Sequence, residues 1–251
     1  MKDILLCGYG NIWRRMYPEY CQLWDVTIYD PFVKEKWVIN EFTRLKWHFD
    51  FAILCLPTPT VDGRCDCTIV NEMVYKLHSK VDIIVIRSTV PVWTTYNLAM
   101  LYCNVIFCPE FYGTTQHQAK NDYLILGGNR ELCNKYAQLY YNVKPADFKI
   151  EFFDNPSTAE MIKYMENCFL ATKVVFCNSF ARACKQAWVE YDDVRQWFLM
   201  DERMNPSHTI VYEWQPYYDS HCLNKDIPAF AHQFNDSFME MVDVINNSRK
   251  K

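Results

Sequence analysis

Short apolar runs rich in β-branched residues alternate with longer mixed stretches in the first half of the chain, and this alternation constrains the fold most strongly. Each run has the length of a buried strand, and each intervening stretch is compatible with a helix. Such alternation is typical of a parallel sheet with helices on both faces, which binds ligands at the carboxyl ends of its strands. We therefore predict an α/β domain over residues 1–155, built on a doubly wound parallel sheet of the Rossmann type. The expected strands are 3–7, 26–29, 51–56, 82–87, 104–107 and 123–126.

The pattern changes near residue 150 to that of a long helix. Ser157 precedes Glu160 by three residues, which is the spacing of a capping box at the start of a helix. Apolar residues then recur at nearly helical intervals from Met161 to Ala187, with no Pro or Gly between them. A helix of about thirty residues often separates two domains or forms a dimer seam.

The remainder of the chain is predicted to be helical as well. Residues 156–251 are expected to form a central or dimerisation domain with shorter helices over 188–240 and a loop around 204–221. The polar tail from Asn246 is expected to be frayed.

The composition is that of a globular protein without a nucleic-acid surface. Half of the 251 residues are apolar, the formal net charge is −4, and no basic run precedes the final Ser-Arg-Lys-Lys. The apolar runs fall well below the roughly 18 residues of a membrane-spanning helix. The first apolar run is also too short for a signal peptide. We therefore expect a cytoplasmic protein with neither nucleic acid nor membrane as a partner.

The twelve cysteines lie mostly in apolar segments, where a reduced thiol behaves as a small hydrophobic side chain. Cys65 and Cys67 form a closely spaced pair, but no second Cys or His pair stands at zinc-ligand spacing. We expect reduced core thiols and no bound metal.

A Gly-x-Gly turn follows the first expected strand at Gly8 and Gly10, and Asp30 ends the second strand 20 residues after Gly10. At this distance an acid typically binds the adenosine ribose of NAD. Trp13 stands where the third glycine of the dinucleotide fingerprint allows close packing of helix and strand. These residues alone are compatible with either a dinucleotide site or a simple tight turn.

Five further segments, in order, carry a more specific pattern. They are CLPTPTVDGRCD (55–66), IRSTVPVWTT (86–95), CPEFYGTT (108–115), STAEMIKYMENCFLATK (157–173) and DSHCLNKD (219–226). With these segments the chain resembles the UDP-glucose and GDP-mannose dehydrogenase family through about residue 230. The resemblance implies an NAD-dependent oxidoreductase of polysaccharide biosynthesis that oxidises the primary alcohol of a nucleotide sugar to a carboxylate.

Such an oxidation requires two hydride transfers, and a cysteine thiolate permits them by trapping the aldehyde as a thiohemiacetal that becomes a thioester. Among the cysteines, Cys222 stands in a polar context beside His221, and the nearby Lys225 favours a thiolate. Cys222 is therefore the predicted nucleophile.

Lys163 and Asn167 are four residues apart on the expected long helix, so both side chains project from one face. Two donors placed in this way suit an oxyanion, although a solvated polar face has the same pattern.

The resemblance implies the remaining roles. Glu110 matches the acid that works with water in thioester hydrolysis, Thr89 the hydroxyl that positions this water, and Asp226 the carboxylate beside the catalytic lysine. Arg203 and Lys225 match substrate-binding positions. Arg203 matches the arginine that family members lend to the neighbouring subunit, which implies a homodimer around the long helix, although a surface arginine at a helix end has the same sequence context. The implied NAD-binding residues are Gly8, Gly10, Asn11, Ile12, Asp30, Pro57, Thr58 and Thr89, with Lys34 or Lys36 as the basic residue after the ribose acid.

Three departures from the family pattern bear on activity. Trp13 replaces a glycine, which is expected to displace the pyrophosphate or weaken NAD binding. Asp219 and Ser220 replace paired glycines before the nucleophile, and the charge of Asp219 is expected to raise the pKa of the thiol. Family members also continue into a second α/β domain that holds the nucleotide of the substrate, whereas this sequence stops at Lys251.

Two hypotheses follow from these departures. The chain is a compact dehydrogenase whose substrate pocket is completed by a second polypeptide or a neighbouring subunit, or it is a catalytically degenerate family member reused as a binding or structural assembly module.

Overall fold

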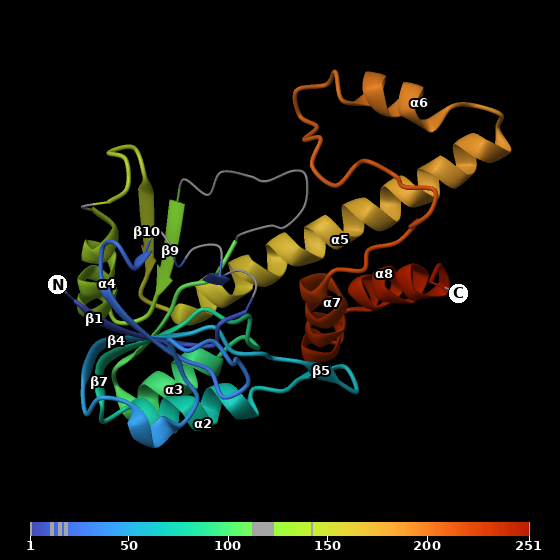
Figure 1. Ribbon diagram of the computed structural model, residues 1–251. Helices are drawn as coiled ribbons and strands as arrows, with labels where there is room; N and C mark the ends of the chain where they lie inside the picture. Colours follow the sequence, from blue (N-terminus) through green and yellow to red (C-terminus); the bar gives the residue numbers. More distant parts are fainter. Residues whose placement is uncertain are drawn as a thin grey trace. The chain divides into compact units, whose positions relative to one another are not determined.

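The structure is a computed structural model that describes residues 2–10, 13–14, 17, 20–111, 123–141 and 143–250. The chain forms two compact units (Figure 1). Among the described residues, unit 1 comprises 2–59, 66–111 and 123–163, and unit 2 comprises 60–65 and 164–250. The domain boundary predicted after residue 155 differs from this division by residues 156–163 and by the segment 60–65.

Unit 1 is built on an eight-stranded sheet with the strand order β10-β9-β8-β7-β4-β1-β2-β3. All six strands expected from the sequence are present, and the α/β prediction is confirmed. The strands are β1 (Asp3–Cys7), β2 (Asp25–Tyr29), β3 (Val38–Ile39), β4 (Phe49–Leu54), β7 (Val81–Ile86), β8 (Val105–Phe107), β9 (Tyr123–Gly127) and β10 (Lys149–Phe153).

The sheet is not parallel throughout, which corrects the sequence-based expectation. β8 and β9 pair antiparallel, whereas β9 and β10 pair parallel, so these last two strands run against the other six. An apolar run carries no mark of strand direction, so periodicity alone could not reveal this reversal. The short edge strands β3 and β10 were also not predicted, because neither is a continuous apolar run.

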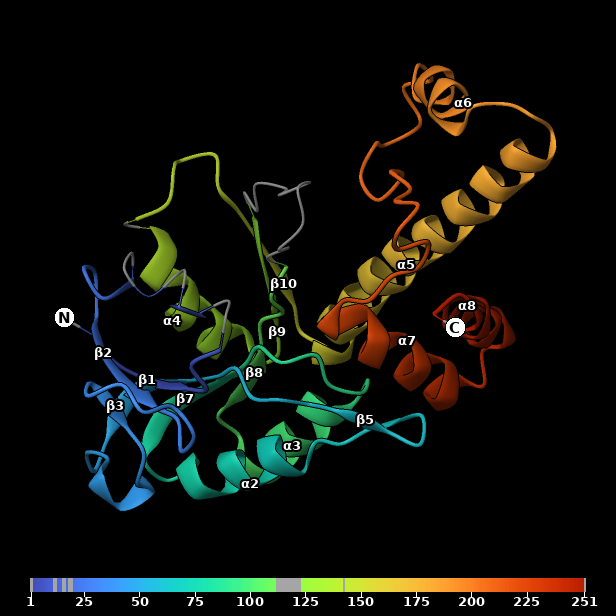
Figure 2. The same cartoon turned by 45° about the vertical axis from the view of Figure 1, so that its right-hand side comes forward.

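Alternate residues of the central strands face opposite sides of the sheet and form two separate cores. In β1, Ile4 and Leu6 pack toward α4 (Arg130–Tyr141), whereas Leu5 and Cys7 pack toward α2 (Thr68–Leu77) and α3 (Thr94–Tyr102). Figure 2 shows α2 and α3 on one face of the sheet and α4 on the other. Helices on both faces are typical of a doubly wound domain, and they leave the carboxyl ends of the parallel strands for ligands.

The long helix predicted from periodicity is α5 (Pro156–Gln186), but its predicted cap is wrong. Ser157 lies inside the helix, and its backbone N–H donates to the Oδ1 atom of Asn155 at 3.0 Å. Asn155 is therefore the capping residue, and Pro156 occupies the first helical position, where its missing N–H costs nothing.

Unit 2 contains the rest of α5, three further helices and a β-hairpin. The helices are α6 (Tyr191–Phe198), α7 (His221–Phe234) and α8 (Ser237–Ser248), and the hairpin consists of β5 (Thr60–Val61) and β6 (Arg64–Cys65). Apolar residues of α5, α7 and α8 form the core of this unit. Among the described residues, no helix combines the length and hydropathy needed to cross a bilayer.

The hairpin packs on α7, although it is far from α7 in the sequence. The hydroxyl of Thr60 donates to the carbonyl oxygen of Lys225 at 2.6 Å, and Arg64 Nε donates to His232 Nε2 at 2.9 Å. Asp62 and Gly63 form the turn with positive φ values of 49° and 75°, as a tight hairpin requires.

The expectation of a frayed tail from Asn246 is wrong. α8 continues to Ser248, and Asn246 is fully buried. Its polar side chain is buried because it has hydrogen-bond partners in a segment 28 residues earlier, which no local pattern could reveal.

Glu160 joins two helices of unit 1 and is fully buried. Its Oε2 atom accepts the backbone N–H of Trp93 at 2.7 Å, and its Oε1 atom accepts that of Thr95 at 2.8 Å. These donors lie at the N-terminus of α3, where unpaired N–H groups and the helix dipole favour a carboxylate. Burial nevertheless raises the pKa of Glu160 to about 7, against the opposing effect of these hydrogen bonds.

This burial predicts a pH-dependent stability. Because the pKa of Glu160 is raised from its ordinary value of 4.5, the native state holds the proton more tightly than the unfolded state. The resulting stabilisation is present below pH 4.5 and is lost as the pH rises through about 7. We expect the free energy of unfolding of the wild type, relative to Glu160→Gln, to fall by about 3 kcal/mol over this range in urea titrations. A pH-independent difference between the two proteins would contradict this assignment.

Candidate active site

The Gly-x-Gly turn follows β1 at the carboxyl edge of the sheet. Gly8 has a φ of +94°, and a Cβ atom there would lie 2.3 Å from the carbonyl oxygen of Cys55, so the position requires glycine. At Gly10, by contrast, an added Cβ would meet no atom of the described residues within 4 Å. The turn thus approaches β4 closely at Gly8 and leaves open space at Gly10, as a backbone cradle for a phosphate requires.

Asp30 ends β2 and braces this turn. Its Oδ2 atom accepts the backbone N–H of Tyr9 at 2.9 Å, and its Oδ1 atom accepts that of Phe32 at 2.9 Å. A carboxylate oxygen can accept more than one hydrogen bond, so both atoms retain capacity for ribose hydroxyl groups. The open turn and this acid together fit the adenosine half of NAD. Asn11 and Ile12, also predicted to bind NAD, lie outside the described residues.

Trp13 is accommodated in the core of unit 1. Its indole is buried, stacks at a tilt against Tyr20 with ring centroids 5.3 Å apart, and donates a hydrogen bond to the Sγ atom of Cys55. The bulky ring therefore does not occupy the open space beside Gly10. A tryptophan at this position packs inside the domain, where the fingerprint has a glycine for close approach.

Two loops that follow neighbouring strands are tied together at the same edge. The buried Thr58, after β4, donates its hydroxyl hydrogen to the carbonyl oxygen of Thr89, after β7, at 2.8 Å. The Ser88 hydroxyl donates to the carbonyl oxygen of Leu56 at 2.7 Å and accepts the N–H of Leu56 at 2.8 Å. The exposed Pro57 lies within the first of these loops. These bonds fix the positions of Thr58 and Thr89 relative to each other.

Glu110 follows β8 and forms an ion pair with Arg87 at the end of β7, with Nη2 and Oε2 2.5 Å apart. Both side chains are largely buried, and Arg87 Nη1 also donates to the Tyr140 hydroxyl at 3.3 Å. A buried ion pair holds its partners in a defined geometry, since separating them leaves an uncompensated charge. Sequence reasoning missed Arg87, although a charge at the end of an apolar strand signals that a partner is needed.

Lys163 lies in α5, within unit 1, and is largely buried. Its Nζ atom lies 4.8 Å from the ring centroid of Phe111, the residue after Glu110. Unit 1 therefore brings the predicted catalytic lysine beside the segment that carries the predicted hydrolytic acid.

In unit 2, Asp226 is buried and connects two other predicted site residues. Its Oδ2 atom accepts the side-chain N–H of Asn167 at 2.6 Å, and its Oδ1 atom pairs with Lys225 Nζ at 2.5 Å. Asn167 stands one helical turn after Lys163 in α5, as the sequence predicted. The bond to Asp226 fixes the Asn167 amide and leaves its second N–H available as a donor.

Cys222 occupies the first turn of α7 and is exposed. The dipole at a helix N-terminus favours a thiolate. By contrast, burial raises the pKa of Cys55 to about 12 and that of Cys108 to about 11. All twelve cysteines are reduced. Cys222 is exposed and also lies at the N-terminus of a helix.

Arg203 is exposed in the loop after α6 and forms a forked ion pair with Asp201, with Nη2 and Oδ2 2.5 Å apart. The structure thus keeps its guanidinium at the surface.

A glycine turn after β1 and an acid at the end of β2, at the carboxyl edge of a mostly parallel sheet, define unit 1 as a dinucleotide-binding domain of the Rossmann type. Two family models match the chain: the NAD-binding domain of the UDP-glucose/GDP-mannose dehydrogenase family over residues 36–144, and the central domain of the same family over residues 157–250. The chain belongs to this family, and NAD is the cofactor that its first domain implies.

Known proteins similar to the chain agree with this assignment. UDP-N-acetyl-D-mannosamine dehydrogenase of Methanococcus vannielii is 29% identical over 191 residues, which cover 70% of this chain and 43% of the relative. UDP-glucose 6-dehydrogenase of Rickettsia prowazekii is 29% identical over 205 residues, which cover 76% and 45%. The chain thus spans less than half the length of these curated relatives.

The fold is similar to that of a UDP-glucose dehydrogenase from Pyrobaculum islandicum. The TM-score is 0.81 at 20% sequence identity, over 99% of this chain and 68% of that chain. This likeness supports the arrangement of elements described above.

The two glycines of the turn predict different mutant behaviour. Gly8→Ala is expected to lower the free energy of unfolding by more than about 2 kcal/mol, because it adds left-handed backbone strain and a clash with Cys55. Gly10→Ala is expected to change stability by less than about 0.5 kcal/mol but to weaken NAD binding at least about tenfold in titration calorimetry, because its methyl group fills the open space. Wild-type NAD affinity in Gly10→Ala would exclude this turn as the cradle.

Proposed function

We propose that the protein oxidises the primary alcohol of a nucleotide sugar to a carboxylate, with Cys222 as the covalent nucleophile. The thiol of Cys222 carries this proposal because it is exposed at the N-terminus of α7, whereas burial raises the pKa of Cys55 and Cys108 in the sheet domain. NAD, when bound, accepts the two hydrides that this four-electron oxidation releases. Each oxidised sugar therefore requires two NAD molecules and one water.

In the proposed reaction, the Cys222 thiolate attacks the aldehyde formed by the first oxidation and gives a thiohemiacetal. The second oxidation converts this adduct to a thioester, and water then releases the carboxylate and regenerates the thiol. Lys163 and Asn167 donate hydrogen bonds to the oxyanion of these adducts. The bond from Asn167 to Asp226 supports this role because a pre-oriented donor stabilises an oxyanion more effectively than a mobile one.

We assign the hydrolytic step to Glu110 and Thr89. The ion pair with Arg87 fixes the Glu110 carboxylate, and the bond from Thr58 to the Thr89 backbone fixes the neighbouring loop. A carboxylate and a hydroxyl held in this manner suit the positioning and activation of a water molecule. Lys225, paired with Asp226, and Arg203 are the proposed substrate-binding cations.

The activity is tested by incubating the protein with NAD and UDP-glucose, UDP-N-acetyl-D-mannosamine or GDP-mannose, while the absorbance of reduced nicotinamide is followed. The wild type is expected to form two reduced nicotinamides per sugar. Cys222→Ser is expected to lower acid production at least about a thousandfold, because it removes the nucleophile.

Cys103→Ser is the matched control for this substitution, because Cys103 is also exposed but lies at the end of α3. It is expected to retain wild-type turnover. If no sugar yields reduced nicotinamide and NAD causes no thermal shift, the proposed activity is rejected. The alternative, in which the fold is reused as a binding or assembly module, is then favoured.

We further propose that the protein is a homodimer that pairs through α5. Met165, Phe169, Phe176 and Phe180 are 73%, 62%, 53% and 49% exposed. At about 100° per residue, these four side chains lie within roughly 60° of one another on the helix. Cys168, Ala171 and Val175 on another face of α5 already pack in the core. A contiguous apolar stripe on a helix is typical of an interface, and a second copy supplies a matching stripe.

Sedimentation velocity tests the dimer. The wild type is expected to sediment as a dimer at micromolar concentration, whereas Phe169→Asp combined with Phe176→Asp is expected to be monomeric, since charges cannot be buried there without partners. Trp47→Asp is the control, because Trp47 is 81% exposed and lies in unit 1 outside the stripe. A monomeric wild type at tens of micromolar would refute the proposed pairing.

A further inference from the structure

The segment that leads into Cys222 is held by side chains of α8. The backbone N–H of Tyr218 donates to Asn246 Oδ1 at 2.8 Å, and Asn246 Nδ2 donates to the carbonyl oxygen of Tyr218 at 3.1 Å. One amide thus satisfies both backbone groups of a single residue, as a neighbouring strand would. Asn246 is fully buried and Tyr218 nearly so, so water cannot replace either bond.

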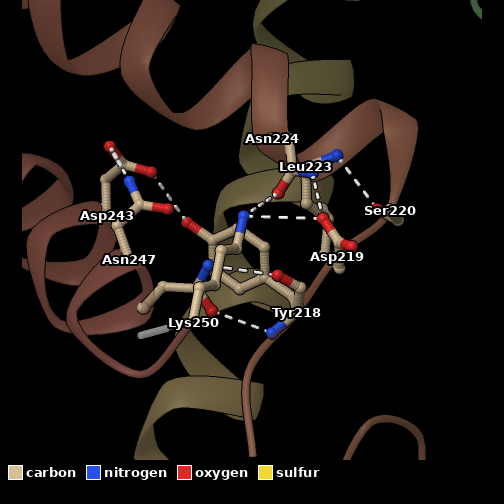
Figure 3. A network of polar contacts seen from close by, with 9 residues as sticks. Tyr218, Asp219, Ser220, Leu223, Asn224, Asp243, Asn247 and Lys250 are labelled. Atoms are coloured by element: carbon tan, nitrogen blue, oxygen red, sulfur yellow. Dashed lines mark hydrogen bonds and ion pairs between the residues drawn. The ribbon is translucent and has the colours of Figure 1, made fainter. Parts of the chain in front are cut away.

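The Tyr218 side chain is also anchored to α8. Its hydroxyl donates to Asp243 Oδ1 at 3.2 Å, and Asn247 Nδ2 donates to Asp243 Oδ2 at 3.0 Å (Figure 3). The bond from Tyr218 to Asp243 adds a second attachment between the helix and the segment, whereas the bond from Asn247 lies within α8.

Asp219 forms the next part of the network. Its Oδ1 atom accepts a hydrogen bond from Asn224 Nδ2 at 2.7 Å and lies 3.5 Å from Lys250 Nζ, which also donates to Asn224 Oδ1 at 3.0 Å. Figure 3 shows the Lys250 amine between these two side chains. The hydrogen bond from Asn224 and the charge of Lys250 hold the pKa of Asp219 below its ordinary value. The negative charge that the sequence places three residues before the thiol is therefore balanced by Lys250.

Ser220 completes the connection to the nucleophile. It is the N-cap of α7, and its Oγ atom accepts the N–H of Leu223 at 3.1 Å. Cys222 is the second helical residue after this cap, so its position follows directly from the conformation of residues 218–220.

We propose that the C-terminal part of α8 is a positioning element for the nucleophile, in which Asn246 orients the segment 218–220 and Lys250 balances the charge of Asp219. This inference rests on the proposed role of Cys222. Asn246 and Lys250 act through the segment and the N-terminus of α7, and they are positioning residues. The tail of the chain thereby controls the reactivity of a thiol more than 20 residues away.

The physical reason is that thiol reactivity depends on the local field. A thiol in the first turn of a helix gains from the helix dipole, whereas an uncompensated carboxylate nearby raises its pKa. Loss of Asn246 leaves the N–H and C=O groups of Tyr218 buried without partners, so the segment must rearrange to reach water. Loss of the Lys250 charge leaves Asp219 uncompensated.

Alkylation of Cys222 by iodoacetamide, followed by peptide mass spectrometry from pH 6 to pH 10, tests this inference without NAD or sugar. Asn246→Ala and Lys250→Met are each expected to raise the midpoint pH of alkylation, by about one unit for Asn246→Ala, which slows alkylation about tenfold at neutral pH. Asp219→Asn is expected to shift the midpoint in the opposite direction. His221, Lys225 and Asp226, the charged or titratable residues near Cys222 on α7, are the same in all of these variants.

Asn247→Ala is the matched control, because Asn247 follows Asn246 on α8 but is exposed and bonds to Asp243. It is expected to retain the wild-type midpoint. A folded Asn246→Ala with an unchanged midpoint overturns the inference, since a merely structural residue would alter stability alone. If Asn246→Ala does not fold, Lys250→Met and Asp219→Asn test the inference, because both residues are exposed. Shifts of the alkylation midpoint in opposite directions support the inference, and unchanged midpoints overturn it.

The outcomes separate this inference from the proposed function. If the protein forms no reduced nicotinamide but the variants shift the alkylation midpoint, the inference holds and the proposed function fails. If the protein is active but the variants leave the midpoint unchanged, the proposed function holds and the inference fails.

Discussion

A backbone N–H or C=O group that leaves water on folding requires a partner, and in this protein side chains from distant elements supply many of the partners for the loops. Asp30 accepts from the glycine turn, Glu160 accepts from the N-terminus of α3, and Asn246 pairs with the segment before Cys222. With only six glycines in 251 residues, these loops are shaped by specific side-chain bonds. The position of each predicted functional residue therefore depends on a residue elsewhere in the sequence.

Periodicity predicted the main elements of the fold because the hydrophobic pattern is set by burial on one or two faces. The six apolar runs became strands, and the unbroken helical pattern became α5. The incorrect predictions have a common cause, which is contact between residues far apart in the sequence. The cap of α5 is Asn155, because Glu160 is engaged by α3, and the polar end of the chain is helical, because Asn246 has partners at Tyr218. A local sequence window contains neither of these partners.

The sequence predicted which types of residue form the candidate site, but not which of their side chains bond to one another. The chemistry of a thiol, an amine and carboxylates directed attention to Cys222, Lys163 and Glu110, whereas Arg87 was missed because its role exists only through the ion pair with Glu110. The structure shows defined contacts for Trp13 and Asp219, the two residues expected from the sequence to weaken NAD binding and to raise the pKa of the thiol. The indole of Trp13 packs in the core, and the charge of Asp219 faces Lys250.

The hairpin of β5 and β6 gives the protein an unusual connectivity. It is encoded between β4 and α2 of unit 1, yet it is part of unit 2 and bonds to α7. Unit 2 is therefore discontinuous, and no single cut in the polypeptide separates the two units. A fragment that begins at α5 would present α7 without its covering hairpin, so evolution cannot exchange this helical part by simple gene fusion unless the hairpin moves with it.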